Sequence, residues 1–68
     1  MDRYERILTL HRILKTARYP VAFDHLKQEL GCSRATLYRD IAFLRDALGA
    51  PLDSDSERHA IAYDREEA

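Results

Sequence analysis

The chain has 68 residues, of which 46% are hydrophobic and 34% are charged, and its formal net charge is −1. A chain of this length forms one small domain with a single core, and without a nucleophile–base pair or a phosphate-binding glycine loop it is not expected to be an enzyme. The single cysteine, Cys32, excludes an internal disulfide, and the lack of a long apolar run or a signal-peptide core predicts a cytoplasmic protein without a membrane span.

The charge is unevenly distributed along the chain. Residues 1–52 carry nine Lys and Arg against six Asp and Glu, whereas residues 53–68 carry two against six. The first part therefore has a net charge of +3 and the second part has −4. Because the field at a docking face matters more than the total charge, this division is compatible with nucleic-acid binding of modest affinity.

Residues 2–17 are predicted to form the first helix. Asp2 suits the N-cap, with Glu5 three residues later as in a capping box. Leu8 and Ile13 extend the apolar surface further than a three-helix core requires, so they either pack against the C-terminal strands or contact a partner. The broad inner face of this helix consists of Tyr4, Ile7, Leu10, His11, Leu14 and Ala17.

The first helix is predicted to end before Pro20, because proline disfavours helical backbone at the preceding Tyr19. Residues 20–22 suit a very short strand. Residues 23–30 are predicted to form the second helix, and Gly31 ends it by adopting a left-handed conformation. The apolar positions of this second helix recur at steps of three and four, at Phe23, Leu26 and Leu30.

A third helix is predicted over residues 33–48, with Ser33 as its N-cap. Its buried stripe repeats at steps of four, three and four, through Leu37, Ile41, Leu44 and Leu48. At about 100° per residue, the opposite surface of the first turns is small, polar and basic, and it consists of Ala35, Thr36 and Arg39 with Arg34 and Tyr38 beside them. Small residues permit close approach to DNA, Arg can donate to guanine or phosphate, and hydroxyls can contact phosphate oxygens.

A short helix, a glycine turn and a longer capped helix make a helix-turn-helix arrangement. Taken alone, the outer face of the third helix could be an ordinary solvated surface. The preceding helix and turn favour DNA recognition instead. Cys32, between the glycine and the cap, is predicted to be a small buried apolar residue rather than a reactive thiol.

Two short strands around a polar turn are predicted to follow, at residues 52–54 and 60–63 with the turn at 55–58. Their apolar anchors are Leu52, Ile61 and Tyr63, and Arg58 and His59 lie near the tip. The acidic residues there do not form a calcium loop, because Arg58 occupies the position that requires glycine. The three histidines lack the spacing of a zinc site, so no metal or cofactor is predicted.

The motif Cys32-Ser33-x-x-Thr36-Leu37-Tyr38-Arg39-Asp40-Ile41, followed by Gly49-Ala50-Pro51, resembles the N-terminal domain of bacterial WYL-domain transcriptional regulators. The resemblance extends over residues 2–64. It implies a DeoR-like winged helix-turn-helix followed by a ligand-sensing WYL domain. The chain departs from that family at Ala22, where a capping Ser or Thr is usual, and at His59-Ala60, where a Gly-aromatic pair is frequent.

These observations predict a mainly α fold with a small β-hairpin, a winged helix-turn-helix of three helices plus a wing over residues 1–63. Residues 64–68 are expected to be a tail or the start of a linker to a further domain. The expected partner is double-stranded DNA, bound in a full-length homodimer, whereas this chain alone is expected to be monomeric or weakly associating. The residues expected to contact DNA are Ser33, Arg34, Ala35, Thr36, Tyr38, Arg39 and Arg58.

The alternative is a winged-helix module that binds another protein and not DNA. Its binding surface would consist of Leu8, Ile13 and Phe43. The nearly neutral charge and the acidic wing favour this alternative. The combination of Thr36, Tyr38 and Arg39 disfavours it, because a protein-binding surface has no need for those three side chains together.

Overall fold

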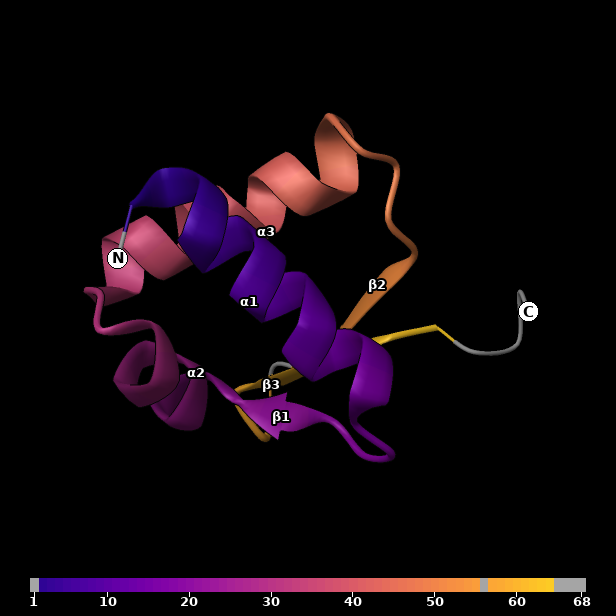
Figure 1. Ribbon diagram of the computed structural model, residues 1–68. Coiled ribbons are helices and arrows are strands. Elements are labelled where there is room, and N and C mark those ends of the chain that lie inside the picture. The colour runs from indigo at the N-terminus through magenta and orange to yellow at the C-terminus, as the bar shows by residue number, and fades with distance from the viewer. Residues whose placement is uncertain (1, 56, 65–68) are drawn as a thin grey trace.

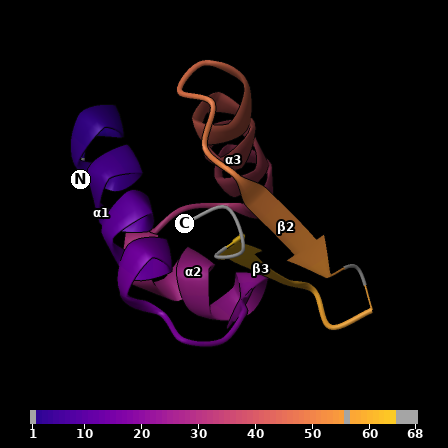
Figure 2. The same cartoon turned by 90° about the vertical axis from the view of Figure 1, so that its right-hand side faces the viewer.

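Three helices and three short strands form the part of the chain that this computed structural model describes, residues 2–55 and 57–64 (Figure 1). In chain order they are α1 (Arg3–Thr16), β1 (Val21–Ala22), α2 (Phe23–Leu30), α3 (Arg34–Asp46), β2 (Leu52–Asp55) and β3 (Ala60–Tyr63). The strands form one antiparallel sheet in the order β1-β3-β2. The hairpin of β2 and β3 projects away from the helices (Figure 2). The winged helix-turn-helix fold is therefore confirmed. Residues 65–68 of the predicted tail and Ser56 of the predicted turn lie outside the described residues.

Hydrogen bonds confirm the predicted start of α1 and the predicted end of α2. The Asp2 carboxylate accepts the backbone N–H of Glu5 at 2.8 Å and caps α1. Ala22 provides no side-chain cap to α2, because a methyl group cannot accept a hydrogen bond. Gly31 has φ of 62° and ends α2 in the left-handed region, where glycine pays no steric cost. The bounds of α2 agree with the prediction.

The C-terminal end of α3 differs from the prediction. The helix ends at Asp46, and Leu48, expected on the buried stripe, is 61% exposed. After Asp46 the backbone N–H groups reach back further than in a helix, with Leu48 donating to the Phe43 carbonyl at 3.3 Å. Gly49, at φ of 67°, then reverses the chain. The Leu48 side chain is consequently directed to solvent, because the helical repeat no longer sets its direction.

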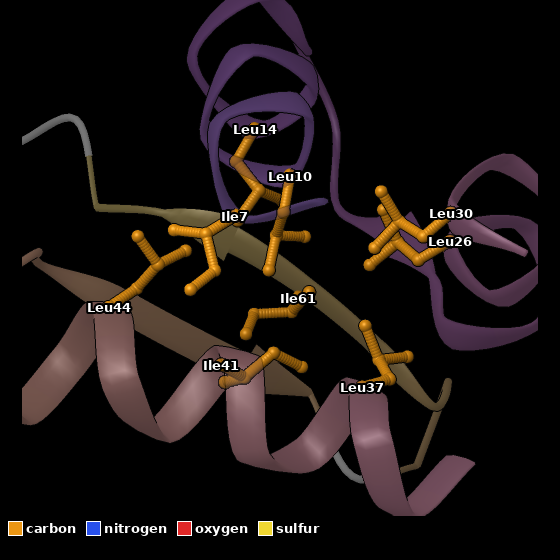
Figure 3. Close-up of a cluster of buried hydrophobic side chains, with 9 residues drawn as sticks. All are labelled: Ile7, Leu10, Leu14, Leu26, Leu30, Leu37, Ile41, Leu44 and Ile61. Carbon is orange, nitrogen blue, oxygen red and sulfur yellow. The ribbon is translucent and has the colours of Figure 1, made fainter. Parts of the chain in front are cut away.

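The core lies where α1, α2 and α3 meet the strand β3 (Figure 3). Leu37 and Ile41 face inward from α3, as predicted, and Ile61 of β3 lies between α3 and α1. The nine buried residues of this cluster are Ile7, Leu10, Leu14, Leu26, Leu30, Leu37, Ile41, Leu44 and Ile61. Ile61 therefore anchors the wing in the core of the helical domain.

Three residues of the predicted inner face of α1 lie outside the core, namely Tyr4, His11 and Ala17. Tyr4 is 81% exposed because it belongs to the first turn of α1, beyond Ile7 at the edge of the core. His11 is exposed, and its Nδ1 lies 2.7 Å from the hydroxyl oxygen of Tyr63. The predicted inner face was thus too wide, because α2, α3 and β3 together cover only the stripe of α1 formed by Ile7, Leu10 and Leu14.

The register of β3 is set on both of its sides. Val21 pairs with Ile61 and Leu52 pairs with Tyr63. The predicted anchors differ in burial, because Ile61 is fully buried whereas Leu52 and Tyr63 are half-buried. This register places the polar turn of the wing at the far end of the hairpin.

His59 precedes β3 with a positive φ of 50°, where a glycine would be unstrained. We expect His59→Gly to leave the free energy of unfolding unchanged or to raise it by up to about 1 kcal/mol, because relief of strain offsets the added chain entropy. Ala62→Gly, in β3, is the control and should lower it by roughly 0.5–1 kcal/mol. Urea unfolding of the two variants gives the comparison. Equal losses in both would show that His59 is not strained.

Candidate nucleic-acid interface

The first two turns of α3 present a small, polar and basic surface to solvent. This surface follows from the opposite face, where Leu37, Ile41 and Leu44 are buried. Six of the seven predicted contact residues belong to it, of which Thr36 is half-buried and the others are exposed: Ser33, Arg34, Ala35, Tyr38 and Arg39. One helix therefore gathers most of the predicted site, and only Arg58 lies elsewhere, in the wing.

The arginines of α3 differ in whether an acidic side chain neutralises them. Within residues 2–55 and 57–64, neither Arg34 nor Arg39 forms an ion pair. Arg45 donates to Asp46, with Nε 3.0 Å from Oδ1, and this hydrogen bond raises the pKa of Arg45 and lowers that of Asp46. The charge of the first half of α3 is thus available to a phosphate or a base edge, whereas that of Arg45 is largely compensated.

The two hydroxyls at the start of α3 have different roles. The Ser33 hydroxyl donates to Thr36 Oγ1 at 3.1 Å and accepts the Thr36 backbone N–H at 3.2 Å. Ser33 is therefore engaged in capping the helix. The proton of the Thr36 hydroxyl is not used in this arrangement, so Thr36 is better placed than Ser33 to donate to a phosphate oxygen.

Tyr38 lies on the side of α3 that faces the wing. Its ring meets the ring of Phe23 edge-on, with centroids 5.6 Å apart and planes at 82°. This contact fixes the ring and leaves Tyr38 45% exposed. Tyr38 lines a depression of about 310 Å³ between α3 and β2, together with Arg45 and Ser54.

The side chain of Arg58 is 78% exposed at the tip of the wing, but it has an acidic neighbour. Its Nε lies 3.6 Å from Oδ2 of Asp55. The other oxygen of Asp55 accepts the backbone N–H groups of Glu57 and Arg58 at 3.1 and 3.2 Å. Asp55 therefore shapes the turn and partly neutralises the one basic side chain predicted to contact DNA from the wing.

The sequence analysis missed a buried ion pair behind this surface. Asp40 is 1% exposed, and Arg6 of α1 donates to both of its carboxylate oxygens, through Nε and, at 3.3 Å, through Nη2. The hydrogen bond to Asp40 raises the pKa of Arg6, against the opposing effect of burial. The position of Asp40 in the sequence indicates its burial, because it lies three residues after Leu37 and four before Leu44, on the buried stripe of α3. A carboxylate there requires a partner.

Arg3 was also missed. Its guanidinium lies over the ring of Phe43, 5.0 Å from the centroid, which joins the start of α1 to the middle of α3. A second depression of about 310 Å³ lies between these helices and is lined by Arg3, Arg6, Thr36, Arg39 and Asp40. No pattern in the sequence connects Arg3 with Arg39, since only the packing of α1 on α3 brings them to one site.

The surface of the alternative interpretation is not assembled. Ile13 and Phe43 are half-buried and pack against the core, and Arg3 covers the ring of Phe43. Leu8 is 59% exposed, and Tyr4, one helical turn earlier, is 81% exposed. Of the three residues predicted for protein binding, Leu8 alone is largely exposed.

Other kinds of site have little support in residues 2–55 and 57–64. They contain no group of three or more His, Cys, Asp and Glu side chains that could hold a metal ion. None of their helices is long and apolar enough to cross a membrane. Cys32 is half-buried against the core, and burial, followed by the charge of Asp40, raises the pKa of its thiol. A raised pKa makes Cys32 a poor nucleophile at neutral pH.

The comparisons with known proteins agree with this geometry. A family model described as an HTH domain matches residues 6–62, which include α2, α3 and all of the wing except Tyr63. No curated protein and no solved structure matched the chain. Because the family match spans most of the chain, the protein belongs to the HTH domain family of helix-turn-helix DNA-binding domains.

Proposed function

We propose that the chain is the sequence-specific double-stranded DNA-binding domain of a bacterial transcriptional regulator. The observation that carries this proposal is the exposed first half of α3, where Arg34 and Arg39 have no acidic partner among the described residues. A helix of this kind enters the major groove with its first turns. Arg39 would read a base edge, because Arg donates two hydrogen bonds to guanine. The wing, residues 52–63, would lie near the backbone.

The resemblance to WYL-domain regulators supports a more specific assignment. Of the residues that carry it, four lie together at the surface of α3, namely Ser33, Thr36, Tyr38 and Arg39, whereas Leu37, Asp40 and Ile41 are buried. In such a regulator a ligand-sensing domain would follow the wing, and a homodimer would place two copies of α3 on paired half-sites. Sensing of a small ligand would then change how tightly the two domains hold the operator.

Arg39→Ala tests the recognition surface. An operator is first selected from a random DNA pool with the wild-type chain. We then expect Arg39→Ala to weaken binding to that operator by about 1–3 kcal/mol, because a bidentate contact to a base is lost. Binding to a scrambled duplex should change much less. Fluorescence anisotropy titrations of both duplexes at several salt concentrations measure the difference.

Arg58→Ala is the comparison for this experiment, because it removes the same charge from the wing. It should weaken binding to both duplexes alike. It should also make the slope of log affinity against log salt shallower by at most about one. The pairing of Arg58 with Asp55 places the expected change at the low end. Unchanged operator binding by Arg39→Ala would show that α3 does not read the DNA.

A second function, protein binding, is favoured by one observation. Tyr4 and Leu8 form an exposed apolar pair on successive turns of α1. Failure of the wild-type chain to enrich any sequence from the random pool would make this surface the better candidate. The outcome can be checked by comparing the wild type with Leu8→Glu in a binding assay against the other domains of the regulator.

A further inference from the structure

One side of α3 faces α1. An α-helix is about 10–12 Å across with its side chains, and the major groove is about 12 Å wide. A helix in the groove therefore has a phosphate backbone on each side. Tyr38 marks the side of α3 toward the wing, whereas Thr36 and Phe43 mark the side toward α1.

The α1 side of α3 carries a basic depression, the one of about 310 Å³ described above. Three of its five lining residues are arginines. The charge of Arg6 is compensated by the buried Asp40, so the net positive charge comes from Arg3 and Arg39. Thr36 adds a hydroxyl that can donate. The guanidinium of Arg3 and the hydroxyl of Thr36 can donate to the acceptor oxygens of a phosphate group, and the positive charge of Arg39 adds to the attraction while its own donors face the base edge.

Arg3 is held in place before any ligand arrives. Its guanidinium lies over the ring of Phe43, and such a contact restricts a long side chain that would otherwise be disordered in solvent. Phe43 is itself half-buried against the core, so it provides a firm support. Asp2 caps the same end of α1 and lowers the local positive potential, but its carboxylate is directed to the backbone N–H of Glu5.

We propose that this depression binds a backbone phosphate of the DNA duplex that α3 reads, with Arg3 of α1 as a direct phosphate contact and Phe43 as the residue that positions it. The inference rests on the proposed function and adds α1 to the DNA interface. A phosphate fixed here would set how far α3 enters the groove, since Arg39 lines the same depression. Arg3 would thereby orient the recognition helix without reading any base.

The first test compares Arg3→Ala with Arg12→Ala. Arg12 is an exposed arginine of the same helix, about 14 Å further along its axis and on its opposite side. Arg3→Ala should weaken binding to operator and scrambled duplex alike, by about tenfold at moderate salt, and make the salt slope shallower by about one. Arg12→Ala should bind as the wild type does. Thermal unfolding of both variants verifies that they are folded.

A second test locates the phosphate. Single phosphates of the operator are replaced by uncharged methylphosphonates, and each modified duplex is titrated with the wild type and with Arg3→Ala. Methylphosphonate at one or two positions beside the base pairs read by Arg39 should weaken DNA binding by the wild type. The same substitutions should leave DNA binding by Arg3→Ala unchanged. Phe43→Leu keeps an apolar side chain in the core and removes the ring under Arg3. It should weaken binding by roughly two- to fivefold, the loss expected for one exposed cation–π contact.

The outcomes distinguish the two levels of the proposal. If the wild-type chain binds neither an operator nor random duplex, the proposed function fails and this inference fails with it. If the wild type binds and Arg39→Ala loses the operator while Arg3→Ala matches Arg12→Ala, only the phosphate site is overturned. The site is likewise overturned if Arg3→Ala weakens DNA binding but remains as sensitive as the wild type to methylphosphonate at every position. Arg3 would then contribute only general electrostatic attraction.

Discussion

Leu37→Ala is expected to unfold a large fraction of the molecules at room temperature. Leu37 is fully buried on α3 and lies near the core side chains of α2 and β3 (Figure 3). Truncation of a buried leucine costs about 2–5 kcal/mol, whereas the single core of a domain of this size rarely supplies more than about 3–5 kcal/mol of stability. Urea unfolding followed by far-ultraviolet circular dichroism measures the loss.

Leu48→Ala is the matched control for this experiment. It removes the same atoms from a residue that the repeat of α3 would have placed in the core, but which is 61% exposed. We expect a change within about 0.5 kcal/mol. Wild-type stability of Leu37→Ala would show that the inner face of α3 is wrongly assigned, and a large loss in Leu48→Ala would show that α3 continues beyond Asp46.

Asp40→Ala should also be strongly destabilising. The Asp40 side chain is 2% exposed, and its loss leaves Arg6, whose side chain is 18% exposed, without its acceptor. Removal of one partner of a buried ion pair costs about 3–5 kcal/mol, and the partial access of Arg6 to water places the expected value near the lower end. Asp46→Ala is the control in the same helix, because its pair with Arg45 is solvent-exposed and contributes little to stability.

A double variant distinguishes the contribution of the ion pair to stability from the contribution of packing at the two positions. Arg6→Leu with Asp40→Leu replaces both partners by apolar side chains, which is often neutral for a buried pair. We expect the double variant to be more stable than Asp40→Ala. If Asp40→Ala loses no more stability than Asp46→Ala, water reaches Asp40 and the pair does not join α1 to α3.

The helices could be predicted because their signals are local. Asp2 and Ser33 are within three residues of the N–H groups that they accept, and Gly31 alone supplies the conformation that ends α2. The periodicity of α3 separates a buried stripe from an exposed one, so the exposed positions of the first turns were identified without knowledge of the packing. The candidate contact residues of α3 were predictable for that reason.

The remaining features depend on residues distant in the sequence. Arg6 meets Asp40 across 34 positions, and Arg3 reaches Phe43 and the depression beside Arg39 only through the packing of α1 on α3. Tyr4 and Leu48 fit the repeats of their helices but are exposed, since a repeat gives the direction of a side chain and not whether another element covers it. The sequence by itself determined where α1 and α3 begin, where α2 ends, and which side of the first turns of α3 is exposed. The tertiary structure decided which charges are neutralised and which gather at one site, because electrostatic interactions depend on distance in space, and the packing of α1 against α3 sets those distances.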